Sequence, residues 1–374
     1  MLSAEKITSS LISFQTVAPK GSERECAKFL FDYLNDMKVA DSEIEIYEFD
    51  ENRANIVATF GTKKDPGLIL SGHMDVVPVG DEKLWQTDPF HSEVRDSRLF
   101  GRGAADMKSG LASIVKSIEN LVKHQTLNRK LVFAATAGEE TGFVGLRRLI
   151  KDSIVKSNSS EYVVIGEPTD LRPARAHRGI YRIKINFFGK SSHAGTPELG
   201  VNAIEYACKF VEELDSIRLE LLNSKDDLLG STTLTPTLIE GGIGENVIPP
   251  STSLVIDSRR LPIHSPGYIR SKIESLCNNL KIGYSTEEIV SEQPLNTPVG
   301  NFLTGLAEEI TGSKSGSCAF GTEGSLYWGE LGIPTMVVGP GSVEQAHIAN
   351  EYVELSQIKK ARSIYSSFIQ KICL

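Results

Sequence analysis

Leu68-Ile69-Leu70-Ser71-Gly72 is a short apolar stretch that leads directly into His73. Three further apolar runs lead in the same way to acidic or histidine residues: 131–136 to Glu139 and Glu140, 162–166 to Glu167, and 334–339 to His347. Short apolar runs of this kind are typical of buried strands in a mostly parallel sheet. Because open α/β sheets bind ligands beyond the carboxyl ends of their strands, the four runs predict one site at a single sheet edge.

The alternation of strand and helix patterns predicts two domains. From the N-terminus to about residue 177, and again from about residue 292, strands alternate with helices, which indicates a doubly wound α/β domain with a mostly parallel sheet. The stretch between them has the order β-α-β-β-α-β of a ferredoxin-like α+β domain. The expected strands are 180–187, 231–238, 251–257 and 282–290, with helices at 202–214 and 267–280. We therefore expect a catalytic domain of residues 1–177 and 292–374 with an inserted domain of residues 178–291.

Composition excludes several classes of function. The chain has 374 residues and a formal net charge of -8, which argues against a nucleic-acid-binding surface. No apolar stretch approaches the ~20 residues that span a bilayer, and the first residues lack the pattern of a secretory signal. The five cysteines are odd in number and form no CxxC pair. These features predict a cytoplasmic protein without a disulfide framework.

Five of the residues at or near the predicted strand ends are nitrogen or oxygen ligands that suit Zn²⁺, and also Co²⁺ or Mn²⁺. They are His73, Asp106, Glu140, Glu167 and His347. Five ligands can serve two ions if one carboxylate bridges them, and Asp106, in a glycine-rich turn, is the candidate. Taken singly, each residue could instead be a cap or a surface group. The pair at 139–140 could also be the solvated first turn of a helix.

The chain resembles the M20 family of dinuclear zinc amidohydrolases and metallopeptidases along essentially its whole length. The stretches that carry the resemblance are Ser71–Pro78, Gly101–Gly110, Gly138–Gly142, Gly166–Thr169, Ser192–Gly195 and Gly241–Pro249. The resemblance implies a zinc exopeptidase-like fold and two divalent metal ions, zinc or cobalt. It also implies a homodimer formed through the inserted domain.

The resemblance further implies a role for each residue of the predicted metal site. Asp106 would bridge the ions, His73 and Glu167 would complete one site, and Glu140 and His347 the other. Glu139 would be the general base that takes a proton from water and passes it to the leaving amine. Asp75 would orient the His73 imidazole. The choice of Glu139 over Glu140 as the base rests on the family pattern alone.

Four residues are candidates for contact with substrate. His193 resembles the family histidine that stabilises an oxyanion, in many relatives from the partner subunit, and Asn246 resembles a substrate-contacting amide. Arg259 resembles the arginine that pairs with a substrate carboxylate, with Arg260 as the competitor for that role. Glu323 would pair with a substrate amine. The other three also have simpler alternatives. His193 could be a loop histidine, Asn246 part of a plain turn, and Glu323 a cap or a supporting carboxylate.

The stretches Phe320–Gly324 and Gly339–His347 resemble family members that release acetate from N-acetylornithine. We therefore expect metal-dependent hydrolysis of the N-acyl amide bond of a small acylated amino acid, without nucleic acid or membrane as a partner. A succinyl-diaminopimelate desuccinylase and a glutamate carboxypeptidase-like peptidase are alternatives within this class. A non-catalytic binding module is the alternative outside it.

Overall fold

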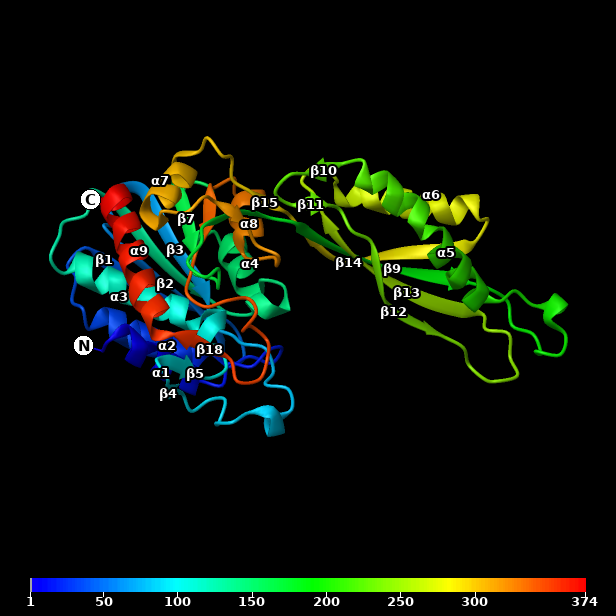
Figure 1. Ribbon diagram of the computed structural model, residues 1–374, viewed down its shortest axis with the longest axis horizontal. Coiled ribbons are helices and arrows are strands. Elements are labelled where there is room, and N and C mark those ends of the chain that lie inside the picture. Colours follow the sequence, from blue (N-terminus) through cyan, green and yellow to red (C-terminus); the bar gives the residue numbers. More distant parts are fainter. Residues whose placement is uncertain (1) are drawn as a thin grey trace. The chain divides into compact units, whose positions relative to one another are not determined.

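The four apolar runs form four adjacent parallel strands in the middle of the larger sheet (Figure 1). In spatial order they are β6 (Arg129–Thr136), β3 (Asp65–His73), β7 (Tyr162–Ile165) and β17 (Thr335–Val337). Antiparallel strands β2 (Arg53–Phe60) and β1 (Ser42–Asp50) extend one side of the sheet. The other side carries β8 (Ala174–His177), β15 (Leu295–Asn296) and β16 (Gly316–Ser317). The computed structural model, which describes residues 2–374, thus confirms the α/β class with a mixed, mostly parallel sheet.

Helices cover both faces of this sheet. On one face, apolar side chains of the strands share a core with the following helices: α1 (Ala4–Ser13), α2 (Glu23–Asn35), α3 (Ser109–Val122), α7 (Phe302–Thr311) and α9 (Leu355–Cys373). Residues that alternate with these along the strands, such as Ile69 and Val132, point to the opposite face. Helix α4 (Val144–Lys151) contacts β1 and β2 there, and α8 (Gly324–Gly329) contacts β17.

A glycine contact brings α3 close to the sheet below the predicted site. A Cβ atom on Gly110 would lie 2.1 Å from the carbonyl oxygen of Gly166, at the end of β7. Any side chain at position 110 would therefore push the helix away from the strand. The contact fixes the start of α3, which follows Asp106, against the residue that precedes Glu167.

The chain forms two compact units. The first comprises the chain up to Ala176 with Asn296–Cys318 and Thr322–Leu374, and the second comprises His177–Leu295 with Ala319–Gly321. The sequence predicted limits at 178 and 291. The first unit also contains a small sheet of β4 (Glu93–Arg95), β5 (Arg98–Phe100) and β18 (Tyr352–Glu354).

The second unit has the β-α-β-β-α-β order expected of a ferredoxin-like domain. Its sheet has the antiparallel order β12-β13-β9-β14, under helices α5 (Ala203–Leu222) and α6 (Pro266–Asn279). The strands are β9 (Gly179–Phe188), β12 (Thr235–Gly241), β13 (Ser251–Arg260) and β14 (Gly283–Glu292). Asn202 caps α5 by accepting hydrogen bonds from two backbone amides, and Ser265 caps α6 ahead of Pro266.

Helix α5 was expected at 202–214 but continues to Leu222, and strand β12 and helix α4 have local reasons for where they begin. Strand β12 was expected at 231–238 but begins at Thr235, because Gly230–Ser231 (β11) pairs back on Lys225–Asp226 (β10) in a separate hairpin. Helix α4 begins at Val144, because Gly142 (φ 95°) and Phe143 (φ 60°) before it have left-handed backbone angles that a helix does not accept. Within residues 2–374 no helix is long and apolar enough to cross a membrane.

Candidate metal centre

Six acidic and histidine side chains of the first unit gather beyond the carboxyl ends of the four parallel strands. We call this set the metal centre: His73, Asp106, Glu139, Glu140, Glu167 and His347. One ligand trio is His73, Asp106 and Glu167, whose ligand atoms lie within 4.8 Å of one another. A second trio of the same spacing is Asp106, Glu140 and His347. The two trios share Asp106, and their nitrogen and oxygen donors fit divalent ions such as Zn²⁺ or Co²⁺.

His73 is the most enclosed of the six. Its side chain is 1% exposed, and its Nε2 atom lies 3.1 Å from Oδ1 of Asp106 and 3.5 Å from Oε1 of Glu167. Its Nδ1 atom lies 2.9 Å from the backbone oxygen of Asp75, so the other ring nitrogen faces the shared carboxylate. Burial disfavours the charged imidazole, but Glu167 and Asp106 outweigh it and hold the pKa of His73 well above its ordinary value.

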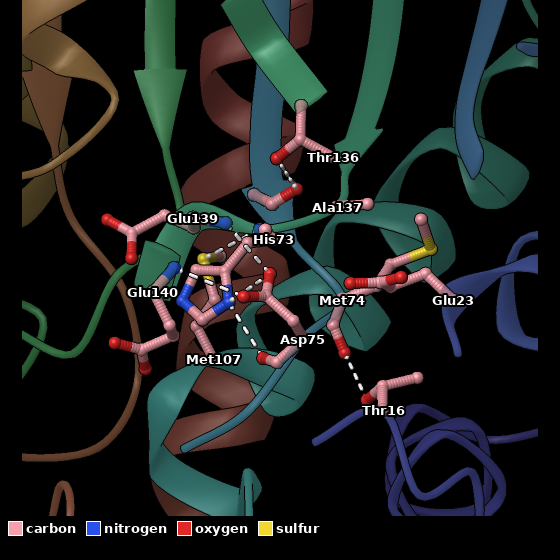
Figure 2. Close-up of polar contacts among 12 residues, drawn as sticks. Thr16, Glu23, His73, Met74, Asp75, Met107, Thr136, Ala137, Glu139 and Glu140 are labelled. Atoms are coloured by element: carbon pink, nitrogen blue, oxygen red, sulfur yellow. Dashed lines mark hydrogen bonds and ion pairs between the residues drawn. The ribbon is translucent and has the colours of Figure 1, made fainter. Parts of the chain in front are cut away.

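Asp75 supports two parts of the centre at once (Figure 2). Its Oδ1 atom accepts a hydrogen bond from the backbone N–H of Glu139 at 3.0 Å, and its Oδ2 atom one from Glu140 at 3.1 Å. The same Oδ1 atom lies 3.6 Å from Nδ1 of His73. Asp75 therefore caps the short helical turn η3 (Glu139–Thr141) in addition to its predicted position beside His73.

Asp106 lies in a turn whose backbone amides donate hydrogen bonds to the buried carboxylate of Glu351. The Oε1 atom of Glu351 accepts hydrogen bonds from the backbone N–H groups of Ala105 (2.8 Å) and Asp106 (3.0 Å). Its Oε2 atom accepts the N–H of Gly103 (3.0 Å) and pairs with the Arg102 guanidinium at 2.7 Å. Gly103 has a φ of 86°, a conformation that favours glycine. The Asp106 carboxylate faces both histidines, and their hydrogen bonds outweigh burial and lower its pKa.

Glu140 and His347 form the more open side of the centre. The Nε2 atom of His347 lies 3.1 Å from Oε1 of Glu140 and 3.4 Å from Oδ2 of Asp106. These contacts raise the pKa of His347 to about 10. The His347 side chain is 52% exposed, and its backbone has a left-handed φ of 65°. His347 thus reaches the centre from a loop rather than from a strand.

Burial governs the two remaining acids. It raises the pKa of Glu167 to about 8, against the opposing effect of His73. It also raises the pKa of Glu139 well above its ordinary value, and the nearby carboxylates of Glu167 and Glu140 add to the shift. A group of atoms from His73, Glu139 and Glu140 also lies within 4.8 Å, so geometry alone leaves either glutamate able to serve as a ligand.

Glu323 lies inside the first unit, beneath the strands that carry the centre. It is 1% exposed, and its Oε2 atom accepts a hydrogen bond from Ser71 Oγ at 3.4 Å. Its Oε1 atom has no hydrogen-bond partner among the described residues. Burial raises the pKa of Glu323 to about 7. This environment favours the supporting role over direct contact with a substrate amine.

The other three substrate candidates belong to the second unit. His193 and Asn246 lie on adjacent segments, since His193 pairs with Val247 and the N–H of Ala194 donates to the Asn246 carbonyl at 2.9 Å. Arg259 is partly exposed and pairs with Asp257 at 2.8 Å, and Arg182 pairs with the same carboxylate at 2.7 Å.

Arg260 has a different environment from its neighbour. It is 1% exposed and donates to the carbonyl oxygens of His264 (3.2 Å) and Glu292 (2.9 Å). Its guanidinium is thus used inside the unit, which favours Arg259 as the arginine available to a ligand.

Sequence reasoning did not identify Glu351 and Arg102 as supports of the centre. Arg102 lies in a stretch already singled out, the glycine-rich turn, whereas Glu351 lies outside those stretches, four residues after His347. The available signal was the position of two charged residues in the sequence: Arg102 lies shortly before the predicted ligand Asp106, and Glu351 shortly after the predicted ligand His347. The partners of Glu351 are mostly backbone amides, which have no signature in the sequence.

This arrangement defines a class: a metal-dependent hydrolase whose site lies at the carboxyl edge of the sheet in an α/β domain. Comparisons with known proteins agree with it. The model of the family described as Peptidase family M20/M25/M40 matches residues 69–371. The acetylornithine deacetylase of Proteus mirabilis (strain HI4320) is 31% identical over 343 residues, which cover 88% of this chain and 86% of the relative. The acetylornithine deacetylase of Buchnera aphidicola subsp. Schizaphis graminum is 30% identical over 98% of this chain and 97% of its own length.

Solved structures share the fold at lower sequence identity. An M20 family metallo-carboxypeptidase from Sulfolobus solfataricus has a TM-score of 0.80 and 17% identity, with 99% of each chain covered. A dinuclear metal-binding peptidase from Bacillus subtilis has a TM-score of 0.70 and 15% identity over 98% of this chain and 96% of its own. The chain belongs to peptidase family M20/M25/M40 and is a hydrolase that acts on amide bonds with divalent metal ions.

Proposed function

We propose that the metal centre holds two divalent ions, zinc in the first place and cobalt as an alternative, with Asp106 as the bridge. His73 and Glu167 complete the first site, and Glu140 and His347 the second. The observation that carries this proposal is that two ligand trios, each with its ligand atoms within 4.8 Å of one another, share the carboxylate of Asp106. Two ions held this close together would stabilise the charge that develops on the carbonyl oxygen of the amide and on the oxygen of the attacking water.

Glu139 is proposed as the general base. Bound divalent ions supply polarisation of the amide carbonyl and a lower pKa for the attacking water. The Glu139 carboxylate takes the proton from that water and delivers it to the leaving amine. Support comes from its burial, which raises the pKa towards the operating range of a base, and from Asp75, which holds its backbone in place.

We propose N-acetylornithine as the substrate, cleaved to ornithine and acetate in arginine biosynthesis. The relatives named acetylornithine deacetylase support this choice, because they are 30% to 32% identical over most of the chain. Arg259 would pair with the substrate carboxylate. Arg182 beside it supports that role, because the two guanidinium groups share the single carboxylate of Asp257 and leave one positive charge unbalanced. His193 and Asn246 would contact the reacting amide.

A direct assay tests the substrate. The protein is incubated with N-acetylornithine, succinyl-diaminopimelate or an acylated glutamate, each with added Zn²⁺ or Co²⁺ and each repeated after removal of metal with a chelator. We expect the release of acetate from N-acetylornithine to be the fastest reaction and to stop without metal. Faster cleavage of either other compound would reassign the substrate to the desuccinylase or the peptidase alternative. No cleavage of any compound would revive the non-catalytic alternative.

The homodimer is proposed through the second unit. Strand β12 is an edge strand whose apolar residues Leu238 and Ile239 are 62% and 56% exposed. Edge strands with exposed apolar residues favour pairing with a second copy across a two-fold axis. If His193 acts in the partner's site, sedimentation should detect a dimer, and a fully active monomer would contradict that role.

A cytoplasmic location is also proposed. All five cysteines are free thiols, and four of them are buried. This usage is typical of proteins in a reducing compartment.

A further inference from the structure

We propose that Glu351 is a positioning residue that joins the turn of Asp106 to the loop of His347 and thereby sets the affinity of the metal centre. This inference rests on the proposed ligand set. The starting observation is the number of donors that bond to this one side chain. They are three backbone amides of a single turn, those of Gly103, Ala105 and Asp106, and the Arg102 guanidinium. All four distances lie between 2.7 and 3.0 Å.

The position of Glu351 makes it a link between two ligand-bearing segments. It follows His347 by four residues and precedes β18 directly. Its backbone oxygen accepts the N–H of Gly101 at 2.9 Å, so main chain and side chain both attach this segment to the turn. Strand β18 then pairs with β5, which leads into the same turn. The carboxylate therefore holds the Asp106 backbone at a fixed place relative to the segment that carries His347.

Electrostatics explain why the residue must be an acid. The Asp106 turn directs three amide N–H groups at one buried point, where a donor left without a partner would cost free energy. A buried carboxylate satisfies these donors and the adjacent guanidinium, and charge-assisted hydrogen bonds of this kind are strong and directional. An amide in its place would turn one N–H₂ group towards these donors. Partners of this kind, one layer outside the ligands, typically change metal affinity by 10–100-fold.

The chain offers a matched control three residues away. Glu354 also pairs with an arginine, Arg98, at 2.7 Å, but both side chains are partly exposed, and this pair is separate from the hydrogen bonds of Glu351 to the Asp106 turn. Exposed ion pairs of this type contribute little to stability. Glu354→Gln therefore removes the same charge from the same segment without touching the proposed link.

The test measures Zn²⁺ content after dialysis against buffers of defined free Zn²⁺, together with the absorption spectrum of the Co²⁺-substituted protein. We expect Glu351→Gln to bind Zn²⁺ 10–100-fold more weakly than the wild type. We expect Glu351→Asp to recover part of that loss, with a Co²⁺ spectrum closer to the wild type. Glu354→Gln should match the wild type. Excess Zn²⁺ should restore the kcat of Glu351→Gln, because this variant lacks bound metal. A variant that had only lost stability would recover less kcat on addition of Zn²⁺.

Wild-type Zn²⁺ affinity and an unchanged Co²⁺ spectrum in Glu351→Gln would overturn the inference. If that variant does not fold, Glu351→Asp decides in the same way, because wild-type affinity there would also overturn it. Asp106→Asn and His347→Ala distinguish this failure from failure of the ligand set. If they too leave Zn²⁺ binding unchanged, the proposed ligands are wrong. If they lose Zn²⁺ while both Glu351 variants bind normally, only the positioning role fails.

Discussion

The two halves of the metal centre differ in how the fold holds them. The inner half, His73 and Glu167, is 1% and 3% exposed and follows directly from adjacent parallel strands. The outer half, Glu140 and His347, is 11% and 52% exposed and comes from a short turn and a loop. Side chains at strand ends inherit the rigidity of the sheet, whereas loop residues need local supports. The supports are visible here: Asp75 holds the turn of Glu140, and Glu351 attaches the segment after His347.

The largest effect on kcat should come from substitution of Glu139, which belongs to neither half of the metal centre. We expect Glu139→Gln to lower kcat by roughly 10²–10⁴-fold, the range of a lost general base, while both ions stay bound. Steady-state kinetics and metal analysis on one preparation measure both quantities. Glu140→Gln is the matched variant and should lose an ion from the outer half. If Glu139→Gln loses an ion and Glu140→Gln keeps both, the two roles are exchanged.

The next effect separates the halves directly. We expect His347→Ala to lose one ion with little change in Tm, because His347 is exposed and comes from a loop. His73→Ala should lose metal and also unfold more easily, because it leaves the buried carboxylate of Glu167 without its imidazole partner. Breaking a buried ion pair costs about 3–5 kcal/mol. Metal stoichiometry and thermal unfolding without metal provide the readout. Equal losses of stability in the two variants would remove the distinction between inner and outer halves.

A smaller effect tests the support of the outer half. We expect Asp75→Asn to lower metal affinity or activity by about 10–100-fold, because one of the two amides of η3 loses a charged acceptor. Asp81→Asn is the control, since Asp81 likewise accepts a backbone N–H at the start of a short helical turn, on an exposed loop. Activity of Asp75→Asn equal to that of Asp81→Asn would mean that η3 needs no such support.

The smallest effect concerns the pH dependence of stability in the metal-free protein. Burial raises the pKa of Glu167 from 4.5 to about 8, so the folded state favours the protonated acid. Its contribution is complete below about pH 4.5 and is lost as pH rises through 8. His73, whose pKa is also raised, acts in the same direction. We expect Tm without metal to fall by a few degrees between pH 5 and pH 8, and Glu167→Gln to flatten that slope. A metal-free Tm that rises over this range would show that the inner half is not strained by its charges.

The inner half could be predicted from the sequence because strand periodicity and ligand type coincide there. His73 and Glu167 each follow an apolar run, and parallel strands bring their ends to one edge. The competition between Arg259 and Arg260 could also have been decided, since alternate residues of β13 are buried and Arg260 falls on the buried face. The start of β12 could not, because the hairpin at 225–231 depends on pairing that local pattern does not express.

The supports of the outer half were harder to predict for a physical reason. Glu351 contacts mainly backbone amides, and Asp75 reaches the amides of η3 through the tertiary fold. Such contacts depend on where a turn lies in space and not on which residues form it. The two alternatives for Glu323 could not be decided from the sequence for a similar reason: the motif around it predicts an acid near the site but not whether that acid faces the interior or a ligand.

The order of the ligands along the chain has a consequence for biosynthesis. The trio of His73, Asp106 and Glu167 can be complete once residue 167 has been translated, whereas the trio that needs His347 stays incomplete until residue 347 has been added. A growing chain therefore cannot assemble the second trio, and a chain truncated before His347 never can. If the two trios are the proposed metal sites, the chain therefore completes the ligands of the first site well before those of the second.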